Sequence, residues 1–289
     1  MSETAPAQPP LIISIQSQVV YGHVGNSAAL FPMQAAGLEV APIPTVIFSN
    51  TPNHPTLRGR ALPADFFADL LRGAEERDLH RRAAFIVSGY IGSVEVAELT
   101  AAFITRAKAL NPDLIYLCDP VLGDTGPGVY VPEAIAAIMR DRLLPLADLA
   151  TPNPFELSWL TGVEINRIGD LRQAAARLQM APGGQLIATG CQLKDTPPDM
   201  IESVIVGPSD ISRHPVQHLP IYVAGTGDLF AGLITSGLAR GLALPDAVEL
   251  GQELTSRALC SARDLGTKEV VLTDPVFRAR LLELGRLVD

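Results

Sequence analysis

Residues 224–232 read AGTGDLFAG, in which two glycines bracket a threonine and an aspartate follows at once. The apolar run at 229–238 that comes next is typical of a helix. Glycines let neighbouring backbone N–H groups turn toward one point, because no Cβ stands in the way. The first turn of a helix adds N–H groups without partners and a partial positive charge. We therefore expect an anion-binding loop at Gly225, Thr226 and Gly227.

Asp228 lies at the edge of this predicted anion site. A carboxylate repels a phosphate, but it can accept the proton of a hydroxyl group that attacks one, and this combination is typical of phosphoryl transfer. The same residues also fit an ordinary turn and helix N-cap, since aspartate caps helices routinely. Two other glycine-rich loops do not fit. Phe230 occupies the third glycine position of a dinucleotide-binding fingerprint, and the Gly-Lys-Ser/Thr triplet of a P-loop does not occur in the sequence.

Composition limits the kind of protein and the kind of partner. The chain has 289 residues, of which 47% are hydrophobic, and a net charge of −9. This fits one large α/β domain or two small ones and argues against a largely disordered chain. The acidic balance argues against nucleic acid or an anionic membrane as partner, and no apolar run reaches the ~18 residues of a membrane span. We expect small-molecule partners, with phosphate bound locally through amides and a metal.

The cysteines and the N-terminal segment bear on compartment and domain organisation. Cys118, Cys191 and Cys260 are far apart and lack the spacing of a zinc site. An odd number of cysteines fits a reducing compartment, so we expect a cytoplasmic protein. Residues 1–10 are polar and proline-rich, without the charged and apolar regions of a signal peptide. We predict a disordered tail at 1–10 and a single domain over 11–289.

Apolar β-type runs alternate with helical segments along most of the chain. The expected strands are 11–15, 40–48, 83–87, 114–118, 148–150 and 185–188, with an antiparallel pair at 201–206 and 211–214. The expected helices are 27–36, one opened by Pro63, 94–110, 132–144, 154–160, 171–179, 229–240, 246–263 and 275–287. The alternation predicts an α/β fold with a central, mostly parallel sheet flanked by helices.

Three segments between these elements are predicted to be loops. We expect loops at 16–26, at the glycine-rich stretch 123–128 and at the proline-rich stretch 49–63, which is long enough to be mobile. The helix that Pro63 opens has Phe66, Phe67, Leu70 and Leu71 on one face, which predicts that this face is buried.

Polar residues follow several predicted strands directly. Asp119, residues 151–153, Thr189 and the Gly225 loop all have this placement, and ligands of parallel sheets bind outside the carboxyl ends of the strands. The hydroxyl groups of Thr151 and Thr189 suit nucleotide phosphates or a monovalent cation, although caps and turns use the same groups.

Acidic residues at these positions suggest a metal. Mg²⁺ is usually held by one or two carboxylates and several waters, which Asp119 or Asp124 near Glu156 can supply. Each residue alone has an ordinary explanation, because aspartate before proline is a common turn and Glu156 suits the first turn of a helix.

Six segments, taken together and in order, resemble the pyridoxal kinase family, and in particular the bacterial pyridoxine/pyridoxal/pyridoxamine kinases. They are SIQSQVVYG (14–22) with VGNS (24–27), FSNTP (48–52), SGY (88–90), DPVLGD (119–124), TPNPFEL (151–157) and GTGDLF (225–230). No single segment suffices, but six in the family's order make the match specific.

The resemblance implies a ribokinase-like fold and ATP-dependent phosphorylation of the 5′-hydroxymethyl group of B6 vitamers. It further implies Mg²⁺, an assisting potassium-type ion and a homodimer. Two alternatives stay open: a hydroxymethylpyrimidine kinase of the same architecture, and a non-catalytic B6-binding protein. The intact Asp228 argues against the second, because a carrier has no use for a base.

The resemblance also implies roles for individual residues. Asp228 is the expected base, and the amides of Gly225, Thr226 and Gly227 are the expected anion hole. The remaining expected contacts are Ser17, Asn53, Tyr90, Gly227 and Asp228 for the vitamer, Asp119, Thr151, Asn153, Thr189, Val216 and Gly225 for ATP, and Glu156, Tyr130 and Asp124 for the metal. The chain departs from the family at Asn53 and His54, where relatives carry a histidine and then an aromatic residue.

Overall fold

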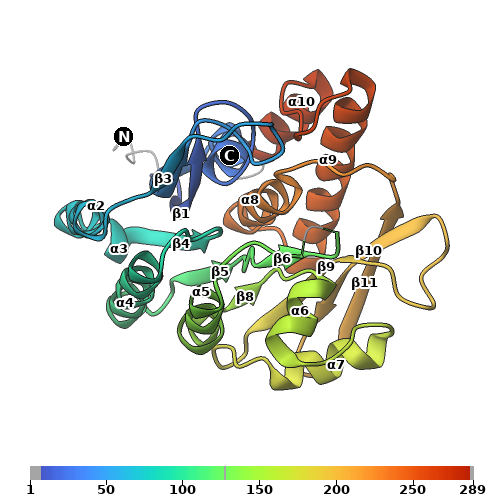
Figure 1. Cartoon of the computed structure of the whole chain (residues 1–289), viewed down its shortest axis with the longest axis horizontal. Coiled ribbons are helices and arrows are strands. Elements are labelled where there is room, and N and C mark those ends of the chain that lie inside the picture. Colours follow the sequence, from blue (N-terminus) through green and yellow to red (C-terminus); the bar gives the residue numbers. More distant parts are fainter. Residues whose placement is uncertain (1–7, 127, 287–289) are drawn as a thin grey trace, which may run out of the picture.

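A nine-stranded sheet runs through the middle of the structure, a computed structural model that describes residues 8–126 and 128–286 (Figure 1). Its strands are β1 (Leu11–Val19), β2 (Glu39–Phe48), β3 (Gly59–Ala61), β4 (Ala83–Ser88), β5 (Ile115–Cys118), β8 (Leu149–Ala150), β9 (Gln185–Cys191), β10 (Met200–Val206) and β11 (Ile211–Gln217). A separate short ribbon pairs β6 (Gly123–Asp124) with β7 (Gly128–Val129).

The strand order is β11-β10-β9-β8-β5-β4-β1-β2-β3. The six strands from β9 to β2 in this order are parallel, whereas β3, β10 and β11 are antiparallel additions at the two edges. The predicted α/β class, the mostly parallel sheet and the antiparallel pair are therefore confirmed.

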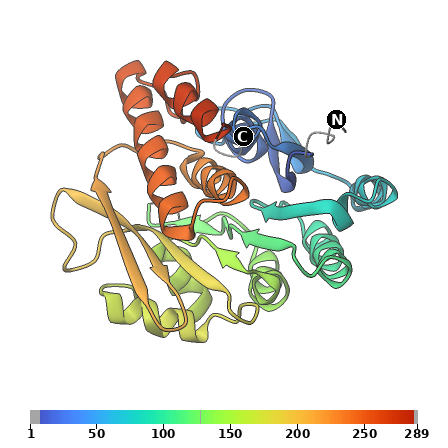
Figure 2. The same ribbon diagram turned by 180° about the vertical axis from the view of Figure 1, so that it is seen from behind.

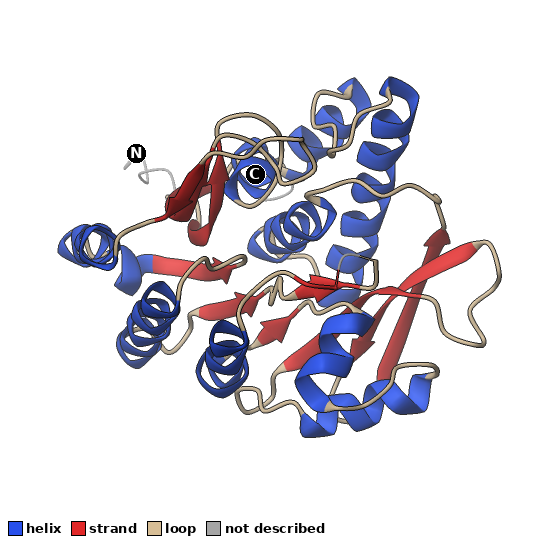
Figure 3. Ribbon diagram, viewed as in Figure 1, coloured by secondary structure: helices blue, strands red, loops and turns tan. Residues whose placement is uncertain are grey.

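Helices cover both faces of the sheet (Figure 3). They are α1 (Asn26–Ala35), α2 (Ala64–Glu76), α3 (Leu79–Arg82), α4 (Val94–Leu110), α5 (Glu133–Ile138), α6 (Pro154–Thr161), α7 (Ile168–Arg177), α8 (Thr226–Ala239), α9 (Leu244–Leu265) and α10 (Pro275–Leu284). One face packs against α2 and α4–α7 and the other against α1, α8 and α9, with α10 outside them, as the view from behind also shows (Figure 2).

Strand β1 shows why the sheet is buried on both faces. Ile13 and Ile15 point into the cluster that holds α2 and α4, while Ile12 points into the cluster that holds α1 and α8, and all three are fully buried. A strand between two helical layers has to be apolar on both faces, which explains the continuous apolar run at its start.

Three predictions in the first half of the chain are wrong: the end of the first strand, the absence of a strand from the 49–63 loop, and the width of the buried face of α2. β1 continues to Val19, where a loop was expected, because Gln18 and Val19 still pair with β2 despite a polar sequence. The proline-rich loop contains β3, which pairs with the end of β2. Phe66 is 52% exposed although Phe67 beside it is fully buried, so the buried face of α2 is narrower than expected.

The second half of the chain differs from the expected boundaries as well. The helix expected at 132–144 leaves α-geometry after Ile138 and continues as a π-helical turn, Met139–Leu143, and a 3₁₀ turn, Leu144–Leu146. Pro145 lies in that last turn, where a proline cannot donate the backbone hydrogen bond that an α-helix needs. Thr189 lies inside β9 rather than after it, and α8 begins at Thr226.

Some expectations fall partly outside the described residues. The predicted tail includes residues 1–7, the glycine-rich loop includes residue 127, and the last predicted helix includes residue 287, all of which lie outside them. Within residues 8–126 and 128–286, no helix is both long and apolar enough to cross a membrane.

Adjacent phenylalanines of α2 provide a test of the packing. Phe67→Ala removes a fully buried ring and should lower the free energy of unfolding by about 3–5 kcal/mol. Phe66→Ala is the matched control and should change it by less than about 0.5 kcal/mol, because its ring is half exposed. Urea denaturation measures both, and equal losses would contradict the packing of α2 described above.

Candidate functional site

The site lies where the strand order of the parallel sheet reverses. β1 is followed in sequence by β2 on one side, whereas β4 lies on its other side. Loops that leave the carboxyl ends of β1 and β4 therefore run in opposite directions, which is the usual ligand position in such sheets, and we call the region between these loops the crevice. Backbone hydrogen bonds tie the following segments to this edge: Asp119 N–H donates to the Ser88 carbonyl at 2.9 Å, and Thr151 N–H donates to the Cys118 carbonyl at 3.1 Å.

The glycine loop opens α8 at the same edge. Gly225 is its N-cap with φ of 86°, a conformation that favours glycine. A Cβ on Gly225 would lie 1.9 Å from the His23 carbonyl oxygen, so only glycine allows the two loops to meet. The Thr226 hydroxyl donates back to the Val223 carbonyl at 3.1 Å, which fixes the turn. The first amides of α8, which a helix leaves without internal partners, are consequently held at an exposed Gly227.

Two aspartates at this loop are buried with an unpaired oxygen each. Asp228 is 9% exposed and Asp119 is 5% exposed, and neither Asp228 Oδ1 nor Asp119 Oδ2 has a hydrogen-bond partner among the described residues. A Cβ on Gly227 would lie 3.6 Å from Asp119 Oδ2, so Asp119 borders the anion loop. Buried polar atoms normally have partners, so two unpartnered carboxylate oxygens beside the glycine loop mark this edge as a candidate binding site.

Burial raises the pKa of three acidic groups at this edge. Burial raises the pKa of Asp119 well above its usual range, and the nearby Glu156 and Asp228 raise it further. Burial also raises the pKa of Asp228, while the Gly25 backbone amide opposes the shift. Burial raises the pKa of Glu156 to about 7, although backbone N–H groups from Asn153, Leu122 and Gly123 act against it. A cation or a proton at this edge relieves the repulsion.

Glu156 shapes the loop that follows β5. Its Oε1 accepts the Leu122 N–H at 2.7 Å, and its Oε2 accepts the Asn153 N–H at 3.0 Å as part of a capping box. Val121, directly before Leu122, has φ of 45°, which is rare for a β-branched residue. Such strain stores about 1–3 kcal/mol and persists only where surrounding contacts enforce it. Glu156 therefore has a clear structural role besides any metal.

Thr151 and Thr189 lie together beside these carboxylates. The Thr151 hydroxyl is buried without a partner among the described residues, and the Thr189 hydroxyl reaches only the Thr151 carbonyl at 3.5 Å. Asn153 is less free than expected for a nucleotide contact: its Oδ1 caps α6 and its Nδ2 donates to the Gly123 carbonyl at 2.9 Å.

The residues expected for the vitamer come from β1 and from the segments that follow β4 and β2. Ser17 is 6% exposed, and its Oγ lies 2.2 Å from the position that a Cβ on Gly25 would take. Tyr90 follows β4 and is held through its carbonyl by the Thr45 hydroxyl at 2.7 Å. The Asn53 side chain is turned to the Lys268 carbonyl at 3.3 Å.

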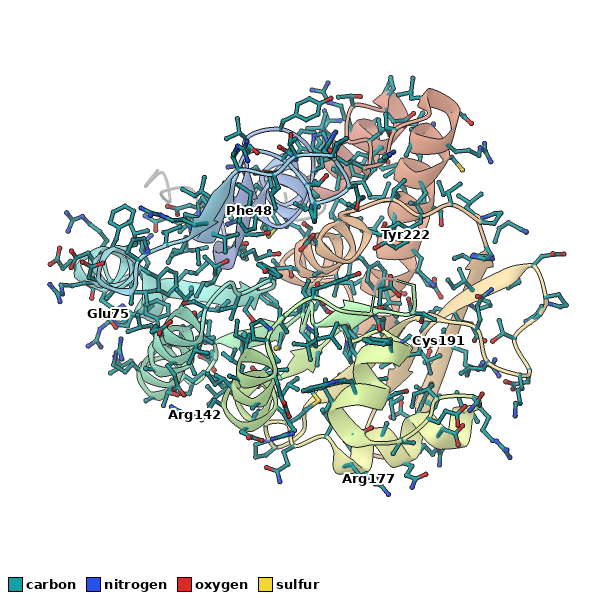
Figure 4. All side chains as sticks on the ribbon, viewed as in Figure 1. Phe48, Glu75, Arg142, Arg177, Cys191 and Tyr222 are labelled. Carbon is teal, nitrogen blue, oxygen red and sulfur yellow. The ribbon has the colours of Figure 1, made fainter. Side chains whose placement is uncertain are left out.

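Three further expected residues come from the edge strand β11 and from the region around β6 and β7. Val216 is part of the edge strand β11. Tyr130 is 40% exposed, and its hydroxyl lies 3.3 Å from that of Tyr222, which Figure 4 labels on the segment before α8. Asp124 accepts the Thr125 N–H at 2.7 Å. In the part of the chain that the structure describes, no three His, Cys, Asp or Glu side chains converge as a metal site.

One residue at the crevice was not anticipated. Glu269 is 8% exposed and contacts two loops of the site, yet it stands in the unremarkable sequence TKEVV, with no motif around it. A parallel bridge between Ala224 and Glu269 brings this distant segment beside the glycine loop.

Known proteins of similar sequence and fold are kinases. The family model for phosphomethylpyrimidine kinase matches residues 34–273. A pyridoxine/pyridoxal/pyridoxamine kinase of Bordetella avium is 38% identical over 90% of this chain and 88% of its own, and a pyridoxal kinase of Arabidopsis thaliana is 35% identical over 90% and 83%. The structure of pyridoxal kinase from Leishmania donovani in complex with ADP and pyridoxine superposes with a TM-score of 0.84 and 27% identity, covering 94% of each chain.

The raised pKa values predict how stability depends on pH. The folded protein retains protons that the unfolded chain releases, so this stabilisation is complete at low pH and is lost as the pH rises through about 7, the value for Glu156. We expect the ligand-free protein to lose on the order of 1–3 kcal/mol of unfolding free energy between pH 5.5 and pH 8.

Asp119→Asn should remove part of this loss and make the protein more stable than the wild type at pH 8, because Asp119 is repelled by Glu156 and Asp228. Asp113→Asn, at an exposed position, is the control. Chemical denaturation at both pH values measures the effect. A wild-type stability that rises from pH 5.5 to pH 8 would contradict the burial of these carboxyl groups.

Proposed function

The chain belongs to the pyridoxal kinase family, and from this premise we propose how its own residues carry out the ATP-dependent phosphorylation of B6 vitamers. The observation that supports the proposal most directly is Asp228, a buried carboxylate with one unpaired oxygen at the N-terminus of α8. The glycine loop in front of it offers backbone amides to an anion. A base and an anion site side by side are what phosphoryl transfer to a hydroxyl group requires.

Asp228 accepts the proton of the 5′-hydroxymethyl group as its oxygen attacks the γ-phosphate of ATP. Its raised pKa brings it closer to the working pH, where a general base is most effective. The amides of Gly225, Thr226 and Gly227 face the charge that spreads over the phosphoryl oxygens, and they need no reorganisation because the turn is already formed.

The vitamer lies between Ser17, Tyr90 and Asp228 in this proposal. Ser17 and Tyr90 come from the two strands at which the sheet order reverses, so they form one wall of the crevice. In this proposal the segment with Asn53, which is attached to the Lys268 carbonyl, covers the bound vitamer and excludes water, which otherwise competes for the phosphoryl group.

ATP runs along the carboxyl edge of the sheet from Gly225 past Asp119, Thr151, Asn153 and Thr189 toward Val216. The unpaired hydroxyl of Thr151 supports this placement. The side chain of Asn153 is engaged in the helix cap and in the Gly123 contact, so Asn153 supports the ATP site by fixing the loop beside it.

Mg²⁺ fits the acidic centre. Asp119 Oδ2, which has no partner among the described residues, and the raised pKa of Glu156 both support a cation at this edge. Asp124 lies in β6, and Tyr130 directly follows β7. When bound with nucleotide, Mg²⁺ neutralises phosphate charge. Oxygens of Thr151 and Thr189 suit a potassium-type ion beside it.

The family resemblance also supports a homodimer, a cytoplasmic location and one kinase domain over residues 11–289. The described cysteines are all free thiols, which fits a reducing compartment.

Replacing Asp228 tests the proposed base. Asp228→Asn keeps the shape of the side chain but accepts no proton, so kcat with pyridoxal should fall ~10²–10⁴-fold. ATP binding, measured by calorimetry, should persist, because the amides of the loop are unchanged. A variant that turns over at nearly the wild-type rate would rule out Asp228 as the base.

Replacing Glu156 tests the metal proposal. Glu156→Gln removes a carboxylate from the acidic centre and should raise the Mg²⁺ concentration for half-maximal rate about tenfold, the usual scale for loss of a charged ligand. A steady-state Mg²⁺ titration measures it. An unchanged titration with a lowered melting temperature would show that Glu156 serves only the helix cap and the strained loop.

A further inference from the structure

Glu269 occupies a place that neither the base nor the anion loop explains. It forms a parallel bridge with Ala224, the residue before the glycine loop. The Ala224 N–H donates to the Lys268 carbonyl at 2.9 Å, and the Val270 N–H donates to the Ala224 carbonyl at 3.2 Å. The backbone of Glu269 is thus fixed to the start of the loop that leads to Asp228.

The carboxylate of Glu269 binds both loops that border the vitamer side of the crevice. Its Oε2 accepts the His23 N–H at 3.1 Å, from the connection between β1 and α1. Its Oε1 accepts the Thr51 hydroxyl at 2.6 Å and lies 3.2 Å from His54 Nε2, both from the connection between β2 and β3. One carboxylate therefore joins three segments that are distant in sequence.

The carboxylate of Glu269 packs directly against the backbone of Gly22. Gly22 has φ of 99°, and a Cβ there would lie 2.2 Å from Glu269 Oε2. The His23 carbonyl in turn touches the Cα of Gly225, as the close approach of a Cβ built on that residue shows. The contacts run without interruption from Glu269 through His23 to the anion loop.

The Asn53–His54 pair belongs to the same arrangement. Asn53 Nδ2 donates to the Lys268 carbonyl at 3.3 Å, next to the His54 contact with Glu269. The His54 ring also packs edge-on against Tyr21, with 5.7 Å between ring centroids. In this chain the two residues thus attach the 49–58 segment to the segment that contains Glu269.

We propose that Glu269 is a positioning residue that holds the two vitamer-side loops, at His23 and at Thr51–His54, in register with the Gly225 anion loop. The inference rests on the proposed function, because it assigns the vitamer to this crevice. Glu269 does not touch the reacting atoms in this account. It makes the vitamer pocket pre-formed, so that binding of the vitamer does not have to order the loops.

Kinetics of Glu269→Gln test this role. A carboxamide has one acceptor oxygen for two separate sets of donors, and its NH₂ group faces a donor on the other side. We expect KM for pyridoxal to rise at least about fivefold, the scale for loss of a charge-assisted hydrogen bond, with KM for ATP changed less than about twofold. Thr51→Val should raise KM for pyridoxal too. In the double variant the rise in KM should be smaller than the product of the two single fold-changes, because both substitutions remove the same contact.

Asp148→Asn is the matched control. Asp148 is a partly buried carboxylate that accepts Lys108 Nζ and the Tyr116 N–H, at the opposite, amino edge of the sheet. It should leave both KM values unchanged even where it lowers the melting temperature. Unchanged KM for pyridoxal in Glu269→Gln, or an equal rise in both KM values, would overturn the proposal.

Limited trypsin digestion separates this proposal from the proposed function. Arg58 is exposed within the 49–58 segment, so release of that segment should speed cleavage there severalfold in Glu269→Gln and not in Asp148→Asn. Absence of pyridoxal turnover by the wild-type protein would count against the proposed function, and faster cleavage at Arg58 would still support the positioning role. Equal cleavage of the variant and the wild type would overturn it.

Discussion

The burial of three carboxyl groups at one edge of the sheet is the constraint on which the rest of the site depends. Asp119, Glu156 and Asp228 come from three different segments, and burial raises the pKa of each. The fold tolerates this because backbone amides of the 122–123 loop and the N-terminus of α8 face the same edge. A proton or a cation at this edge lowers the cost of burying these groups, which is consistent with the metal–nucleotide complex proposed above.

Close approaches of backbone convert this acidic edge into a defined crevice. Gly225 against His23 and Gly22 against Glu269 bring loops nearer than any side chain at those positions allows. Val121 adds a strained backbone that Glu156 holds through the Leu122 amide. Stability is thus given up at the site, where rigid placement of amides and carboxylates serves the transfer of a phosphoryl group.

The sequence predicts the layers of the fold well, because alternating apolar runs and helices have few ways to pack. It predicts less well where pairing overrides local pattern: residues 16–19 are polar and still extend β1, since β2 supplies the hydrogen bonds. Motifs locate Asp228, Asp119 and Thr151, and the structure brings them to one edge. Glu269 was missed because its role arises only from a bridge to Ala224, which no local sequence pattern signals. The engagement of Asn153 in a helix cap is likewise a property of the folded loop.

The central claim is that this acidic crevice transfers phosphate to a B6 vitamer rather than to a pyrimidine, although the family model is described as phosphomethylpyrimidine kinase. The most direct test is an ADP-release assay that compares kcat/KM for pyridoxal and for hydroxymethylpyrimidine with the same purified protein. The account predicts a clear preference for pyridoxal, with ADP released in step with the phosphorylated vitamer. A preference for hydroxymethylpyrimidine, or no ADP release with any vitamer, would contradict it.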